Sequence, residues 1–123
     1  MPQDYRELAV WQKAVALGKS VQTLTEEYRL EASANVIIRA LHEATAELPV
    51  CIIVGCTNRD AERLAQAIRI AYDHAHRIEY LLFLSLLWDY LPYGGLRPLM
   101  RTARQIKALL AGHLQELRKG GCR

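Results

Sequence analysis

Residues 62–91 read ERLAQAIRIAYDHAHRIEYLLFLSLLWDYL and contain neither glycine nor proline. Apolar residues recur along this stretch at alternating steps of four and three, the spacing of one helical face: Leu64, Ile68, Ala71, Ala75, Ile78 and Leu82. In its second half, apolar residues occupy nearly every other direction as well: Tyr80, Leu81, Phe83, Leu84, Leu87 and Trp88. A helix that is apolar all round is buried or meets a second molecule. The stretch therefore predicts a long helix with an intermolecular contact.

Two further helices are expected around this one, over residues 8–27 and 96–119. Each repeats apolar residues at helical spacing, beginning with Val10 in the first and Leu99 in the second. The sequence PYGG at 92–95 separates the long stretch from the last helix, and Gly120 and Gly121 end the chain's last helix. Pro98 falls in a first turn, where proline is tolerated.

The segment 31–55 is harder to interpret, because helical spacing leads into Pro49 and then into the β-branched run VCIIV. No second strand-like run exists to pair with it, so we predict a helix kinked at Pro49. Gly55 is expected to end this helix in a left-handed conformation. Thr57 or Asn58 is expected to cap the next helix.

Four helices with short connections predict an all-α, up-down-up-down antiparallel bundle, with residues 1–123 forming a single domain. A chain of 123 residues, 51% of them hydrophobic, suffices for one core. Cys51, Cys56 and Cys122 lack CxxC spacing, which argues against a zinc site or a disulfide framework. The N-terminal residues MPQDYRE do not resemble a signal peptide, and no apolar run reaches the length of a membrane span. A cytoplasmic protein without a membrane partner is expected.

The phrase YRELAVWQKAVAL, at residues 5–17, carries a family resemblance. It resembles the opening of four-helix-bundle proteins encoded by intervening sequences of large-subunit ribosomal RNA genes. The matching positions are Tyr5, Leu8, Val10, Trp11, Gln12, Lys13 and Ala14. Weaker matches follow in order, at 48–55, 78–79 and 90–91. The sequence departs from the family pattern at His42-Glu43, at Cys51 and at 53–55.

This resemblance implies a four-helix bundle that assembles into a ring, commonly a homopentamer, without an established enzymatic activity. A related branch consists of accessory proteins of diversity-generating retroelements, which are thought to act with a reverse transcriptase and nucleic acid. The resemblance therefore adds nucleic acid or a reverse transcriptase as alternative partners. It assigns no role to the positions that depart from the pattern.

The polar residues give no catalytic or metal-binding pattern. A cluster of possible ligands lies at Asp73, His74, His76 and Glu79, with spacings of three from Asp73 to His76 and from His76 to Glu79. No matching Glu-x-x-His pair occurs on another helix, as a bundle di-metal site requires. His42 with Glu43, and His113, are isolated polar residues beside apolar ones. We therefore predict no catalytic residue, no metal and no cofactor.

Positive charge is concentrated at the C-terminal end of the chain. From Arg97 to Arg123 there are seven basic residues and one acid, whereas the remaining sequence sums to −3. The candidate binding stripe is Arg97, Arg101, Arg104 and Lys107. Such a stripe either contacts nucleic-acid phosphates or remains a solvated face or a salt-bridged subunit contact.

The preferred interpretation is a non-enzymatic homo-oligomer with a structural or interaction role. Its interface is predicted at Leu81, Leu84, Leu87 and Trp88. The alternative is a nucleic-acid-binding accessory protein that uses the basic last helix.

Overall fold

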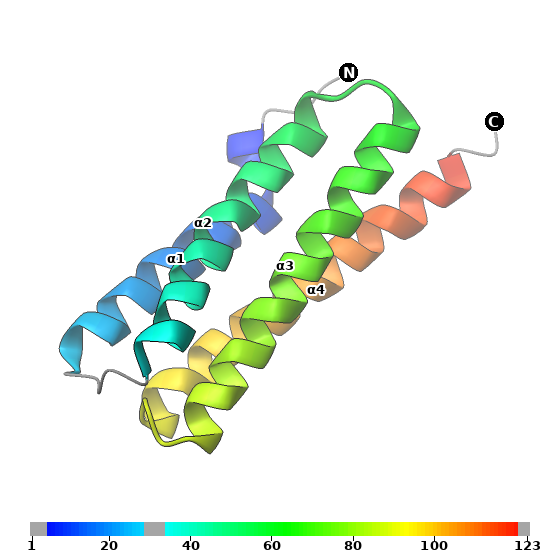
Figure 1. Cartoon of the computed structure of the whole chain (residues 1–123). Coiled ribbons are helices and arrows are strands. Elements are labelled where there is room, and N and C mark those ends of the chain that lie inside the picture. The colour runs from blue at the N-terminus through cyan, green and yellow to red at the C-terminus, as the bar shows by residue number, and fades with distance from the viewer. Residues whose placement is uncertain (1–4, 29–33, 121–123) are drawn as a thin grey trace.

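A computed structural model describes residues 5–28 and 34–120 as four helices packed side by side (Figure 1). A short 3₁₀ turn, η1 (Tyr5–Glu7), precedes α1 (Ala9–Glu27). Then follow α2 (Asn35–Thr57), α3 (Ala61–Leu87) and α4 (Tyr93–Gly120). Successive helices run in opposite directions, and α2 with α3 and α3 with α4 share the most extensive contacts. The predicted all-α bundle is confirmed, and the part of the chain that the structure describes holds no strand.

One hydrophobic core runs along the bundle, and it is formed by the apolar residues that recur at helical spacing in each helix. The fully buried side chains of greatest volume include Leu17 and Val21 from α1, Leu41 and Leu48 from α2, Ile78 and Leu82 from α3, and Leu96, Ile106 and Leu110 from α4. Alanines on α3, such as Ala71 and Ala75, are also completely buried and permit close approach of the neighbouring helices. No described helix is long and apolar enough to cross a membrane.

The residues of the VWQKA phrase hold the first helix to its surroundings. The Tyr5 ring meets the Trp11 ring edge-on, with their centroids 5.3 Å apart. The Gln12 side chain donates a hydrogen bond to the Arg6 carbonyl at 2.9 Å, and Lys13 Nζ donates to Gln105 Oε1 on α4 at 3.1 Å. The phrase thus fixes the entry into α1 and its contact with α4.

The α2 helix continues through Pro49 and ends at Thr57, so the VCIIV run is helical. The prediction of a left-handed Gly55 is wrong, because no described glycine has a positive φ. Gly55 is needed for a different reason. A Cβ atom there would lie 3.3 Å from Leu64 Cδ1 and 3.5 Å from Ala67 Cβ on α3. The missing side chain therefore allows α2 and α3 to pack closely.

The connection from α2 to α3 uses a different cap from the one expected. Asp60 is the N-cap of α3, and its carboxylate accepts a hydrogen bond from the Glu62 amide at 3.1 Å. The Asn58 side chain instead accepts from the Asp60 amide at 3.1 Å, which shapes the turn before the cap. The expected cap at Thr57 or Asn58 was therefore wrong, because α2 extends through Thr57.

The connection from α3 to α4 also differs from the prediction. The long helix ends at Leu87 instead of Leu91, and Asp89 adopts a positive φ of 57°. This turn brings Leu91 back into the core, where it is buried. The α4 helix then begins at Tyr93, earlier than the predicted residue 96. A Cβ on Gly95 would lie 2.6 Å from Leu24 Cδ1, so glycine permits the start of α4 to pack on α1.

Candidate functional site

Lys107 lies in the contact between α3 and α4 and is not available as part of an exposed stripe. Its ammonium group is 3.0 Å from Glu79 Oε1 and 3.0 Å from His76 Nδ1, and it lies 5.5 Å from the centre of the Tyr72 ring. Only 18% of its side chain is exposed. The four-membered basic stripe is therefore corrected to three residues, because Lys107 is directed toward α3.

The three arginines of the stripe lie on the outside of α4 but differ in their surroundings. Arg104 Nε is 3.7 Å from Glu79 Oε2 and remains 62% exposed, a weak surface contact. Arg97 and Arg101 are exposed, and no side chain in the described ranges pairs with either of them. The positive charge available to a partner on this face is therefore carried chiefly by Arg97 and Arg101.

The polar residues of α3 are directed to different neighbours. His74 Nε2 lies 3.4 Å from Glu47 Oε2 on α2, whereas His76 contacts Lys107 on α4. Within the described residues, no group of three His, Cys, Asp or Glu side chains could hold a metal ion. Asp73, His76 and Glu79 thus form no joint ligand set there.

His42 is engaged in a contact between two helices, and Cys51 is a poorly reactive thiol. His42 Nε2 is 3.0 Å from the Thr25 hydroxyl and links α1 to α2. Burial, with a smaller contribution from the nearby Glu47 carboxylate, raises the pKa of the Cys51 thiol. A raised pKa keeps the thiol protonated near neutral pH and therefore poorly nucleophilic.

An exposed apolar surface covers the second half of α3, and we call it the α3 face. It consists of Tyr80, Phe83, Leu84, Leu87 and Trp88. Tyr80, Leu87 and Trp88 are 57%, 55% and 52% exposed, and Leu84 is half-buried. Leu81, by contrast, is only 7% exposed and belongs to the chain's own core. The predicted interface therefore loses Leu81, because this side chain is directed toward the core.

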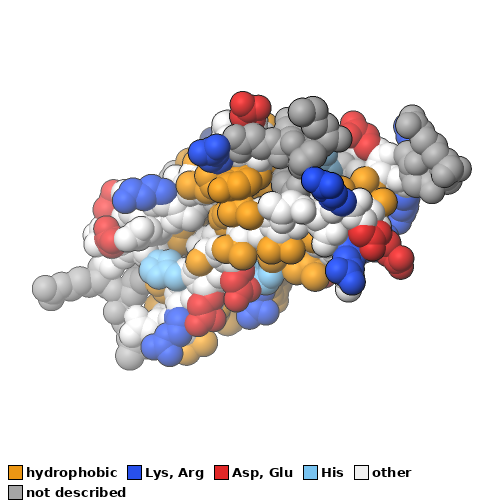
Figure 2. Space-filling model, turned by 90° about the horizontal axis from the view of Figure 1, so that it is seen from above, with side chains coloured by type: hydrophobic (Ala, Val, Ile, Leu, Met, Phe, Trp, Pro, Cys, Tyr) orange, Lys and Arg blue, Asp and Glu red, His pale blue; other side chains and the backbone are white. Residues whose placement is uncertain are grey.

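A second exposed apolar surface, which the sequence analysis did not single out, lies on α2. Val50 and Val54 are both largely exposed, and we call these two residues the α2 face. Their spacing of four residues places them on one side of the helix, opposite the buried Leu41 and Leu48, whereas the exposed Val36 lies on the same side but fourteen residues earlier, beyond Glu43 and Glu47. The spacing of four between Val50 and Val54 is visible in the sequence, but the β-branched residues after Pro49 equally fit a strand. On the face of the molecule drawn in Figure 2, hydrophobic side chains are exposed between acidic and basic ones.

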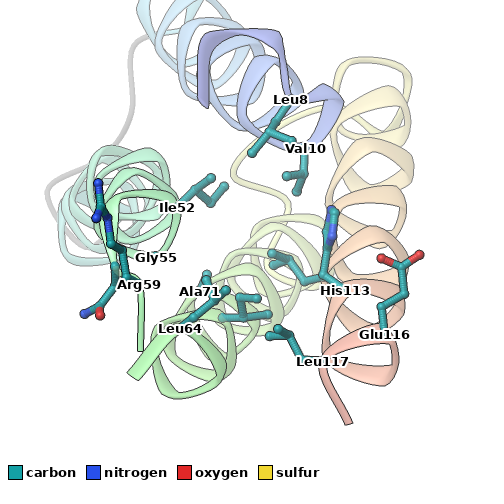
Figure 3. A pocket seen from close by; sticks show the side chains of 13 residues that line it. Leu8, Val10, Ile52, Gly55, Arg59, Leu64, Ala71, His113, Glu116 and Leu117 are labelled. Carbon is teal, nitrogen blue, oxygen red and sulfur yellow. The ribbon is translucent and has the colours of Figure 1, made fainter. Parts of the chain in front are cut away.

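A cavity of about 740 Å³ lies where the start of α1, the end of α2, the start of α3 and the end of α4 meet. Most of its lining is aliphatic, including Leu8, Val10, Ile52, Leu64, Ile68 and Leu117. His113 also lines it, and Figure 3 shows this ring directed toward α1, whereas Arg59 and Glu116 point away from the centre. In the sequence, His113 is an isolated polar residue and nothing indicates a cavity beside it.

Comparisons of the chain with protein-family models, with curated proteins and with solved structures gave no significant match.

Proposed function

We propose that the protein is a non-enzymatic interaction module that works as a closed homo-oligomeric ring. The observation that carries this proposal is the α3 face. Its aromatic and leucine side chains are contiguous along the last turns of one helix, at positions 80, 83, 84, 87 and 88. Contiguous exposed apolar surface on a small soluble domain marks a contact with another molecule.

A second copy of the chain is the partner that accounts for both exposed surfaces. The α3 face and the α2 face are different in composition and lie on neighbouring helices. If the α3 face of one copy packs on the α2 face of the next, a single type of contact covers both surfaces. Such a head-to-tail contact leaves no unpaired face only when the chain of copies closes on itself.

The positions of the two helices limit the size of the ring. In a bundle of square cross-section, the outward directions of neighbouring helices differ by about 90°. Each docked copy is then turned by about 90° relative to the previous one. Because Val50 and Val54 lie near the end of α2 and the α3 face lies at the opposite end of the bundle, closure at about four or five copies also requires the copies to be inclined to the ring axis. The pentamer implied by the family resemblance falls within this range.

Charge favours the same pairing of unlike surfaces. The α4 helix starts just beyond the α3 face and presents Arg97 and Arg101 outward. The outside of α2 carries Glu43 and Glu47 between its valines, together with Arg39. Opposite charges at the rim of an apolar contact steer association and fix its register more than they raise its affinity.

The test is the mass of the protein in solution at micromolar concentration, measured by light scattering. The wild-type chain is expected to give about four or five times the 14.0 kDa of one chain. Leu87→Glu and Val54→Glu are each expected to give a single chain, because either change would bury a charge without a partner. Val15→Glu, at an exposed apolar position on α1, is the matched control and should keep the full mass.

Mixing the two disrupted variants tests the head-to-tail arrangement. A Leu87→Glu chain retains its α2 face, and a Val54→Glu chain retains its α3 face. Their mixture should form a pair of twice the mass of one chain and nothing larger, since the other face of each copy is blocked. A Val54→Glu chain that pairs with itself would instead indicate a symmetric contact between two α3 faces. A wild-type chain that remains single would reject self-assembly altogether.

A second candidate function is nucleic-acid binding through Arg97, Arg101 and Arg104. It is supported by the exposure of the first two, which pair with no side chain of residues 5–28 and 34–120. Titration of labelled RNA and duplex DNA should show sequence-tolerant binding that weakens by about 0.7–0.9 log units per phosphate contact for each tenfold rise in salt. Arg97→Gln with Arg101→Gln should remove this binding, whereas Arg63→Gln with Arg69→Gln on α3 should preserve it. Absence of binding to both nucleic acids at low salt would reject this candidate.

A further inference from the structure

The cavity at the end of the bundle has the size and lining of a small-molecule site. Its volume of about 740 Å³ lies within the range of about 300–1,000 Å³ that is usual for ligand pockets. All four helices contribute to its wall, so it is a concavity of the whole fold. Leu64, Ile68 and Leu117 remain half-buried there, whereas the core residues farther along the bundle are fully buried. At this end of the bundle, these apolar side chains line the cavity and are less completely covered by the other helices than the core residues are.

The His113 side chain is placed to orient a ligand. His113 is half-buried on the cavity wall, and no side chain of the described residues hydrogen-bonds to its ring. A neutral imidazole carries one donor and one acceptor. Because the ring is only half-buried and its nitrogens remain accessible to water, a ligand oxygen near this ring would take the place of a water molecule. Arg59 and Glu116 are turned away from the centre and leave the interior without a fixed charge (Figure 3).

We propose that this cavity binds an aliphatic molecule that carries a single oxygen head group, a hydroxyl or a carboxyl. The chain of the ligand would lie against Leu8, Ile52, Leu64 and Leu117, and its head group would hydrogen-bond to His113. The lining is mostly aliphatic and contains no Phe, Tyr or Trp side chain, which suits a flexible chain better than a planar ring system. The site is separate from the α3 face, so the proposal does not depend on ring assembly.

The experiment is calorimetric titration of the full chain with 1-decanol and with decanoate, both below their aggregation limits. We expect saturable binding of at least one of them. Shortening the chain should weaken binding by about fourfold for each methylene removed, the value for burial of a methylene group. Stronger binding of decanoate that weakens with salt would identify a carboxylate ligand, and equal binding of the two would identify the hydrogen-bonding oxygen alone as the recognised group.

Leu117→Trp should reduce the affinity at least tenfold, because the larger side chain occupies the cavity. Leu114→Trp is the matched control. This leucine is also half-buried on α4 but does not line the cavity, so affinity should be unchanged. His113→Phe keeps a ring of similar size without a hydrogen-bonding atom, and it should weaken binding by about fivefold to tenfold. Circular dichroism establishes that each variant remains helical.

Two results would overturn the proposal. The first is the absence of binding of either compound to the wild-type chain at millimolar concentration, which would mean that the cavity is filled by the protein itself. The second is that Leu117→Trp and Leu114→Trp lose affinity equally, or that neither variant loses affinity. Either outcome would place the bound compound elsewhere on the surface.

Discussion

The two halves of α3 share one buried stripe but have different outer surfaces. In the first half, the outward positions are occupied by Arg69, Asp73 and Arg77, all exposed and charged. In the second half, Tyr80 and Leu87 take the corresponding outward positions. The core therefore requires the same spacing along the whole helix, whereas the outer surface is free to vary. An apolar outer surface that the core does not require indicates selection for a contact with another molecule.

The largest difference is expected when one inward and one outward leucine in the second half of α3 are each replaced by alanine. Leu82→Ala should lower the free energy of unfolding by about 3 kcal/mol, because Leu82 is fully buried and leaves a cavity. Leu87→Ala should change it by less than about 0.5 kcal/mol in a single chain. Urea unfolding in the Val54→Glu background measures both values without the contribution of assembly. Similar losses at the two positions would mean that Leu87 is buried within its own chain.

The inward stripes were predictable because burial imposes a spacing on each helix separately. The periodic apolar positions of α1 and α4 lie in the core as their spacing indicates: Val10, Ala14, Leu17, Val21 and Leu24, and Leu99, Ala103, Ile106 and Leu110. The position of Lys107 could not be predicted from the spacing within one helix. This residue shares a sequence spacing with Arg104, but its contact with Glu79 depends on how α3 and α4 are aligned along their axes. The cavity beside His113 likewise depends on how four helix ends meet, which no single helix encodes.

The boundary between the two halves of α3 lies close to Glu79, whose carboxylate faces α4. Glu79→Gln should lower the free energy of unfolding by about 1–2 kcal/mol, because it leaves the largely buried Lys107 ammonium without its anionic partner. Arg104→Gln is the matched control and should cost less than about 0.5 kcal/mol, since that contact is long and exposed. Chemical denaturation measures both. Equal effects would show that Lys107 is satisfied by His76 and Tyr72 alone.

The N-cap residue Asp60 contributes to the stability of the charged first half of α3, in addition to the buried core residues. Asp60→Ala should lower the free energy of unfolding by about 1 kcal/mol, because the Glu62 amide loses its acceptor. Asp73→Ala removes a carboxylate from the same helix away from its end and should be nearly neutral. Thermal unfolding followed by circular dichroism is sufficient to compare them. A neutral result for Asp60→Ala would show that the first turn is held by packing alone.

Asp89 lies in the turn just after α3, and its replacement by glycine is expected to have the smallest effect. Its φ of 57° is a conformation that glycine adopts without steric cost and that other residues adopt at some cost. Asp89→Gly should raise the free energy of unfolding by about 0.5 kcal/mol, because relief of the backbone slightly exceeds the greater entropy of the unfolded chain. Asp89→Val should lower it by about 1–2 kcal/mol, since a β-branched side chain fits this region poorly. Urea unfolding of the two variants, again in the Val54→Glu background, gives the difference directly. If both variants behave alike, the turn rearranges without loss, and the return of Leu91 to the core does not depend on the left-handed residue.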